Sequence, residues 1–282
     1  MKRILLPTDF SENAYNAIAY ALQLYKNEIC EFYLLHTYTP AFVSAGSMID
    51  SYSALTLQKV AQENAENRLN ALKEKLDDNF KNSKHNFTTV ASFNMLISEM
   101  KRITEENAID LLIMGTQGAT GAKEIFLGTH TMYAIKNMKI PVLAVPANFS
   151  YEEPKEILFP TDFKVQKDNR YLDLIKEICE THISRLHILN AYYGTPLSDE
   201  QKGTKEFLDI FFGANAHLFH IAEGTDVLGA VEKFQIKNKI NFMVMVHNKH
   251  SFLENILFKP VINQVVYHTN VPFLVIPSIE RQ

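Results

Sequence analysis

The residues best suited to chemistry are glycines at a fixed spacing. Gly115, Gly118 and Gly128 form the pattern Gly-x2-Gly-x9-Gly-Thr, which ends at Thr129. Because glycine has no Cβ atom, the backbone at Gly115 and Gly118 can take positive φ and press its N–H groups against an anion. A helix predicted to begin at Gly128 adds first-turn N–H groups and a favourable dipole, and Thr129 and Thr131 add hydroxyl donors. The pattern indicates a phosphate-binding loop; the alternative is a glycine-rich turn with a threonine cap and nothing bound.

Alternating strands and helices are predicted to position this loop. In residues 1–147, short aliphatic runs predict strands at 3–8, 31–37, 87–92, 109–114 and 141–145. Between them, amphipathic stretches predict helices at 11–26, 52–81, 95–106 and 128–137. The runs lack polar alternation, so they predict strands buried on both faces of a parallel sheet. In such doubly wound sheets, ligands bind beyond the carboxyl ends of the strands, where the strand order switches.

The sequence contains this unit twice. Residues 4–10 (Ile-Leu-Leu-Pro-Thr-Asp-Phe) recur as residues 157–163 (Ile-Leu-Phe-Pro-Thr-Asp-Phe). The second copy predicts strands at 155–160, 184–190, 216–221, 240–246 and 272–276. We therefore expect an α/β fold of two tandem, doubly wound, five-stranded parallel-sheet domains at 1–147 and 154–282, joined by a short polar linker.

The two copies are unequal. Their offset falls from 153 at the first shared motif to 131 at the last, so the second copy is 22 residues shorter between its second and third strands. Its glycine positions are also replaced: Val246 aligns with Gly115, Lys249 with Gly118, Lys259 with Gly128 and Pro260 with Thr129. A branched residue, long side chains and a proline disfavour the tight loop, so only the first copy is expected to bind phosphates.

Composition excludes several classes of protein. The 282 residues carry a net charge of −4 with no basic run, which argues against nucleic-acid binding. No apolar run reaches the roughly 18 residues of a membrane span, so we expect no membrane association and a cytoplasmic location. Cys30 and Cys179 form no metal-ligand or redox motif and are predicted to be buried thiols.

Taken together, the Pro-Thr-Asp strand end, the glycine pattern and the following Pro-Val-Leu strand resemble the universal stress protein family in its tandem form. The resemblance implies a Rossmann-like fold of the adenine nucleotide alpha hydrolase type, binding ATP or another adenine nucleotide, with Mg²⁺ or Mn²⁺ placed by Asp9. It implies an adenine site at Pro7, Thr8, Asp9 and Thr37, a lining residue at Met114, and phosphate contacts at Gly115, Gly118, Gly128, Thr129, His130 and Thr131. His130 departs from the family, which usually has a small aliphatic residue there.

A regulatory, nucleotide-binding role in the stress response is therefore expected, without a catalytic residue. The alternatives are a slow ATP hydrolase and an interaction or scaffold protein that binds no nucleotide. Only Lys123 lies near the loop as a candidate phosphate clamp, so we expect at most a weak ATPase. The resemblance implies that single-domain relatives form dimers joined along their last strands. A tandem chain can form that pair internally, and the sequence leaves open whether two chains also form a homodimer.

Histidines offer weaker signals. His36, near the end of a buried strand, is interpreted as a hydrogen-bonded structural residue, with a catalytic base as the alternative. His217 and His220 should lie on opposite faces of one strand, which argues against joint metal ligation. His247 and His250 flank the degenerate loop with Lys249 and Lys259, which fits either a solvated remnant or a different anion or metal site.

Overall fold

The computed structural model describes residues 1–38, 51–116, 128–192, 196–223, 227–247 and 270–278. The strands of these ranges are β1 (Lys2–Pro7), β2 (Cys30–Thr37), β3 (His85–Ser92), β4 (Leu111–Gly115), β5 (Val142–Val145), β6 (Glu156–Pro160), β7 (Arg185–Tyr192), β8 (His217–Glu223), β9 (Phe242–His247) and β10 (Phe273–Pro277). The helices are α1 (Glu12–Leu24), α2 (Ser51–Phe80), α3 (Leu96–Asn107), α4 (Thr129–Asn137), α5 (Leu172–His182), α6 (Asp199–Phe211) and α7 (Val227–Lys237).

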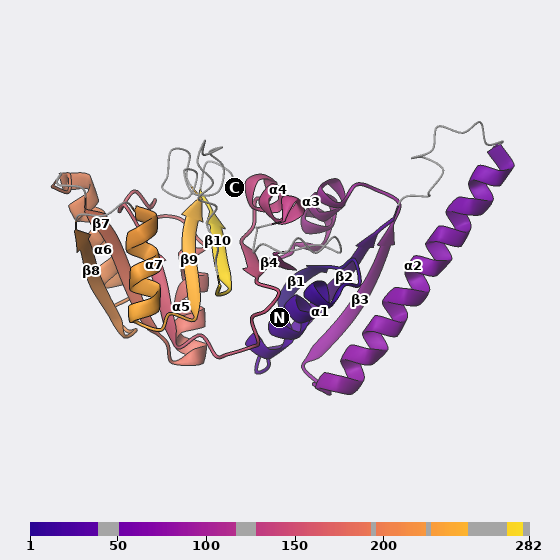
Figure 1. The fold of residues 1–282 in the computed structure, drawn as a ribbon, viewed down its shortest axis with the longest axis horizontal. Helices are drawn as coiled ribbons and strands as arrows, with labels where there is room; N and C mark the ends of the chain where they lie inside the picture. The colour runs from indigo at the N-terminus through magenta and orange to yellow at the C-terminus, as the bar shows by residue number, and fades with distance from the viewer. Residues whose placement is uncertain (39–50, 117–127, 193–195, 224–226, 248–269, 279–282) are drawn as a thin grey trace.

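All ten strands form one sheet, in the order β3-β2-β1-β4-β5-β10-β9-β6-β7-β8 (Figure 1). Each copy has the same internal order, and neighbouring strands within a copy are parallel. The copies meet where β5 and β10 pair antiparallel, with Leu143 opposite Leu274. The predicted α/β fold class is confirmed, and the two five-stranded sets are continuous rather than separate sheets.

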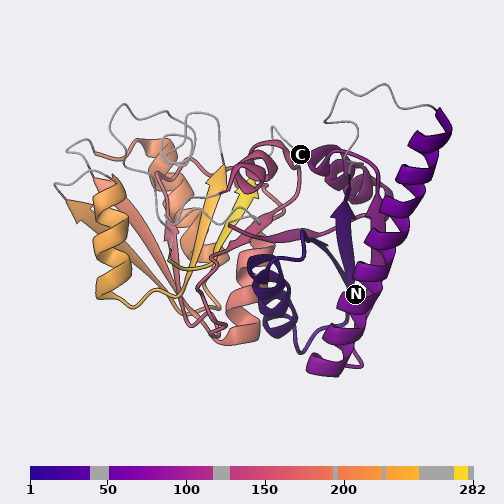
Figure 2. The same ribbon diagram turned by 45° about the vertical axis from the view of Figure 1, so that its right-hand side comes forward.

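Helices cover both faces of the sheet (Figures 1 and 2). One face packs against α1, α2, α5 and α6, and the other against α3, α4 and α7. Strand β1 shows why its sequence lacks polar alternation: Ile4 and Leu6 belong to the first core and Leu5 to the second, all fully buried. Both pleat directions therefore require apolar side chains.

The long helix α2 extends past the carboxyl ends of the strands (Figures 1 and 2). Its carboxyl-terminal part packs on the sheet through the buried Leu69 and Leu76. Nearer its start, Leu55, Leu57 and Val60 are exposed. The helix therefore does two things: it covers β2 and β3, and it projects beside the edge where ligands bind in this class of fold.

The helices that follow β1 and β6 begin at different points of the repeat. Ser11 caps α1, because its hydroxyl accepts a hydrogen bond from the Ala14 N–H at 3.2 Å. The equivalent residue in the second copy is Lys164, whose ammonium cannot accept a hydrogen bond. Residues 161–171 are accordingly irregular, and α5 starts at Leu172. No helix of the described ranges is long and apolar enough to cross a lipid bilayer.

Candidate functional site

The order of strands places a topological switch point between β1 and β4, because β1 leads to α1 on one face of the sheet and β4 leads towards α4 on the other. In this class of fold, ligands bind in the crevice beyond the carboxyl ends of the strands at such a point. The structure brings most predicted site residues to this edge: Pro7 ends β1, Thr8 and Asp9 follow it, Thr37 ends β2, Met114 and Gly115 end β4, Gly128 precedes α4, and Thr129, His130 and Thr131 open α4. Gly118 and Lys123 lie outside the described residues.

The turn after β1 is held by its own side chains. The Phe10 N–H donates to the Thr8 hydroxyl at 2.9 Å, and the Ser11 N–H donates to the Asp9 carboxylate at 3.0 Å. Phe10 takes a left-handed φ of 64°, which these bonds stabilise against its steric cost. Thr8 is buried and Asp9 is exposed at the crevice. The Pro-Thr-Asp motif therefore has a structural role besides any contact with a ligand.

The same turn follows β6 in the second copy. The Phe163 N–H donates to the Thr161 hydroxyl at 2.9 Å, and the Lys164 N–H donates to the Asp162 carboxylate at 3.1 Å. Phe163 has a φ of 57°. Retention of Asp162 is thus explained by the backbone turn, without a ligand.

Gly115 lies close to a neighbouring side chain. A Cβ atom added there would lie 2.6 Å from the Asn13 Nδ2 atom, closer than such contacts occur. Its φ lies outside the left-handed region, so the expectation of positive φ at Gly115 is wrong. Asn13 belongs to the first turn of α1 and was not singled out by the sequence, because no spacing rule links it to Gly115.

The start of α4 is tied to the end of β4. The Gly128 N–H donates to the Thr116 carbonyl, and the Thr131 hydroxyl donates to the Gly115 carbonyl at 2.8 Å. Gly128 has an ordinary φ of −57°. These bonds fix where the helix begins relative to the crevice.

The first turn of α4 presents hydrogen-bond donors to the crevice side of the fold. The N–H groups of Thr129, His130 and Thr131 have no acceptor within the helix, as at any helix start. Thr129 and His130 are exposed. The nearby Thr116 hydroxyl is buried and has no hydrogen-bond partner among the described residues. A buried unsatisfied hydroxyl beside unpaired helix N–H groups is an arrangement that an anion would satisfy.

His36 makes the structural hydrogen bond that its position predicts. Its Nδ1–H donates to the Thr8 carbonyl at 2.8 Å, and its ring lies 4.5 Å from the Phe10 ring centroid. Burial lowers the pKa of His36, the bond to Thr8 opposes this, and the Arg68 charge lowers it further. The imidazole is therefore held neutral and helps to rigidify the turn after β1.

The matching edge of the second copy lacks these features. Val246 occupies the Gly115 position and is buried, and the buried His247 follows it at the end of β9. Lys249, His250, Lys259 and Pro260 lie outside the described residues. Within the described ranges, no group of three or more histidine, cysteine, aspartate or glutamate residues could hold a metal ion.

His217 and His220 of the second copy form structural hydrogen bonds. His217 bonds the Asp209 carboxylate on α6 at 2.8 Å. His220 bonds His187 at 3.0 Å, and its ring lies 4.7 Å from that of Phe234 on α7. Since α6 and α7 cover opposite faces, the two strand histidines point apart, as predicted.

An asparagine repeats in register and was missed from the sequence. The Asn16 amide donates to the Pro146 carbonyl at 3.2 Å and to the Phe149 carbonyl at 3.1 Å. In the second copy, the Asn169 amide donates to the Pro277 carbonyl at 3.0 Å. Both follow the Pro-Thr-Asp motif at the same distance, which was the available signal. Each bond ties the segment after the first strand of its copy to the end of the last strand.

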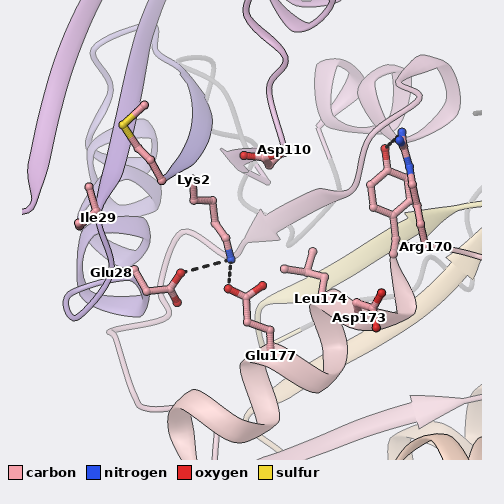
Figure 3. A pocket seen from close by; sticks show the side chains of 10 residues that line it. Lys2, Glu28, Ile29, Asp110, Arg170, Asp173, Leu174 and Glu177 are labelled. Atoms are coloured by element: carbon pink, nitrogen blue, oxygen red, sulfur yellow. Dashed lines mark hydrogen bonds and ion pairs between the residues drawn. The ribbon is translucent and has the colours of Figure 1, made fainter.

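A cavity of about 520 Å³ lies at the other end of the strands, near the amino-terminal ends of β1, β2 and β4, between the copies (Figure 3). The Lys2 ammonium reaches the Glu177 carboxylate of α5 at 2.5 Å and the Glu28 carboxylate at 3.4 Å. Burial raises the pKa of Glu28; Lys2 lowers it and the Glu177 charge raises it. This cluster bridges the copies and contains none of the predicted site residues.

The fold is that of a doubly wound α/β protein, and the first turn of α4 lies near the switch point at the carboxyl ends of the strands. The family model of the universal stress protein family matches residues 1–146, and the chain belongs to this family. Universal stress protein MJ0577 of Methanocaldococcus jannaschii is 31% identical over 155 residues, covering 51% of this chain and 94% of that protein.

Similarity beyond residue 146 is a similarity of fold. The crystal structure of a universal stress protein from Archaeoglobus fulgidus covers 98% of this chain and 96% of its own, with a TM-score of 0.70 and 20% identity. Another universal stress protein, solved in complex with cAMP, covers 45% of this chain and 99% of its own, with a TM-score of 0.34 and 16% identity. A score that low places no ligand in this chain.

Proposed function

We propose that the protein binds one adenine nucleotide, ATP in the first instance, through its first copy and acts as a regulatory protein in the stress response. The observation that carries the proposal is the start of α4. The first turn of α4, with Thr129 and His130 exposed, stands near the buried Thr116 hydroxyl after β4, which has no hydrogen-bond partner among the described residues. Unpaired donors and the helix dipole favour a phosphate there.

The described residues divide into contacting and positioning groups. The backbone N–H groups of Thr129 and His130, with Gly118 from the sequence pattern, are assigned to the phosphates. Thr131 and Gly128 act as positioning residues, because each already donates a hydrogen bond to the end of β4. Gly115 leaves the room that Asn13 occupies.

The nucleoside is assigned to the edge formed by β1 and β2. Pro7, Thr8 and Thr37 line this edge, and Met114 lies at the end of β4. The exposed Asp9 carboxylate is assigned to the nucleoside or to Mg²⁺ or Mn²⁺ accompanying the phosphates. Carboxylate oxygens suit these hard cations.

The second copy is assigned the role of a built-in partner. Val246 replaces the glycine that ends β4 in the first copy, and β10 joins β5 across the middle of the sheet. Residues 1–147 would then form the nucleotide-binding domain and residues 154–282 the domain that completes an internal pseudo-dimer.

Counting bound nucleotide tests the proposal. Protein freshly purified from cells is denatured, and the released nucleotide is quantified. A separate, folded sample freed of nucleotide is titrated with Mg-ATP. We expect a stoichiometry of no more than one per chain, without appreciable release of ADP over the titration. Two equivalents would contradict the asymmetry, and no binding in either measurement would contradict the site.

A further inference from the structure

Helix α2 brings an arginine to the edge of the sheet where β1 and β2 end. The Arg68 guanidinium carbon lies 4.0 Å from the centroid of the Phe10 ring. Phe10 follows Asp9 directly, and its ring also contacts the His36 ring at 4.5 Å. Three planar groups, from α2, the turn after β1 and the end of β2, therefore meet at one place.

Arg68 keeps its charge available there. The residue is exposed, and within the described ranges no carboxylate forms an ion pair with it. Burial lowers the pKa of His36 most, the hydrogen bond to Thr8 raises it, and the Arg68 charge lowers it further. The Arg68 charge therefore lies close enough to act on the end of β2. A guanidinium held against an aromatic ring has lost much of its freedom and can receive a planar ligand at low entropic cost.

The proposed function gives the direction in which a bound nucleotide extends. Its phosphates are assigned to the start of α4, beyond the end of β4. The nucleoside is assigned to the ends of β1 and β2, which lie on one side of β4 in the sheet. Phe10, the residue that Arg68 contacts, belongs to the turn after β1 and therefore lies on the nucleoside side.

We propose that Arg68 contacts the nucleotide by stacking its guanidinium on the purine base. The proposal rests on the proposed function of the first copy and names a residue that the glycine pattern does not include. Arginine planes stack on aromatic faces, and such contacts stabilise a base without reading its edge.

The described residues of the second copy show no counterpart to this arrangement. Helix α6 has 13 residues where α2 has 30, so it lacks the part that projects beside the edge. Phe163, the equivalent of Phe10, is buried and packs on Phe219 with ring centroids 6.2 Å apart. Counted back from the last residue of each helix, Asp199 of α6 takes the position that Arg68 has in α2, so the second copy has a carboxylate there in place of the guanidinium.

Competition binding tests the contact. A fluorescent ATP analogue is displaced by ATP, adenosine or inorganic tripolyphosphate from the full-length protein and its variants. In Arg68→Ala, the dissociation constants of ATP and adenosine should rise by the same factor, about fivefold, while that of tripolyphosphate is unchanged. Arg68→Lys should lose about as much, because its ammonium has no plane to stack.

Lys75→Ala is the matched control. The Lys75 ammonium lies 4.0 Å from the centroid of the Tyr15 ring of α1, so it makes the same kind of cation–aromatic contact farther along α2. Lys75→Ala should leave all three dissociation constants unchanged, and urea unfolding checks that the three variants are folded.

Equal effects of Arg68→Ala and Lys75→Ala would overturn the proposal. So would a loss confined to ATP and tripolyphosphate, since that would mean a phosphate contact. Failure of the unaltered protein to bind any of the three ligands would instead overturn the proposed function.

Discussion

The two copies share a turn but differ at the helix that faces it. After β1 and β6, the same side-chain hydrogen bonds hold the same left-handed phenylalanine. At the end of β4, Gly115 leaves space for Asn13, whereas Val246 takes the matching position in β9. A motif that serves the backbone was kept in both copies, and features suited to an anion are present in one. Shared sequence in a repeat therefore identifies what the fold requires, and differences identify candidate function.

The copies also differ in how far they extend beyond the sheet. Helix α2 projects past the strands through its first residues and carries Arg68 beside the buried Leu69, while α6 begins at Asp199, the position that matches Arg68. A charged helix far from any motif gives no local signal for such a residue. Only its packing on β2 and β3 brings it to Phe10.

Making the first copy like the second at one position should have the largest effect. Gly115→Val places a branched side chain where Asn13 lies 2.6 Å from a Cβ atom. We expect nucleotide binding to be abolished and the free energy of unfolding to fall by about 1–3 kcal/mol, the cost of overpacking. Isothermal titration with Mg-ATP and urea unfolding measure the two effects.

Two further variants separate packing from binding in that experiment. Adding Asn13→Ser to Gly115→Val removes the clashing amide and should restore part of the stability. Val246→Gly in the second copy should leave the nucleotide stoichiometry unchanged. Normal ATP affinity in Gly115→Val would show that the end of β4 does not approach the ligand.

The paired aspartates test whether the shared turn has two roles in one copy. Asp9→Ala and Asp162→Ala each remove one hydrogen bond to a backbone N–H. Each should lower the free energy of unfolding by about 1 kcal/mol. Only Asp9→Ala should weaken Mg-ATP binding, measured with and without Mg²⁺. A similar loss of affinity in both variants would remove the functional distinction between the copies.

Much of this molecule could be predicted from the sequence, because strand burial and the repeat are local patterns. The runs around Ile4 and Ile157 are apolar at every position, which indicates strands covered on both faces. The glycine spacing predicted a helix start at residue 128, and α4 begins at Thr129.

Contacts between distant residues could not be predicted in this way. The approach of Asn13 to Gly115 depends on how α1 leaves β1, and the contact of Arg68 with Phe10 depends on how α2 packs on the sheet. The donor role of Thr131 was assigned to phosphate from its type, yet its hydroxyl bonds the Gly115 carbonyl. Each of these depends on three-dimensional register, which a single sequence does not encode at the level of motifs.

Acidification should have the smallest effect and should distinguish the copies by their histidines. Burial lowers the pKa of His36 and His85 in the first copy and of His182 and His220 in the second. The unfolded chain therefore binds protons more readily at these sites, and the stability they contribute above pH 6.5 is lost as the pH falls below it.

His217 acts in the opposite direction. Burial would lower its pKa, but the Asp209 hydrogen bond and nearby carbonyls raise it, so its stabilisation is present in acid and is lost as the pH rises through the raised value. We expect the urea midpoint to fall between pH 7.5 and 5.5, and to fall further in His217→Gln. In His220→Gln the fall should be smaller, because one imidazole that resists protonation is gone. A midpoint that rises on acidification would mean that His217 outweighs the four histidines whose pKa is lowered.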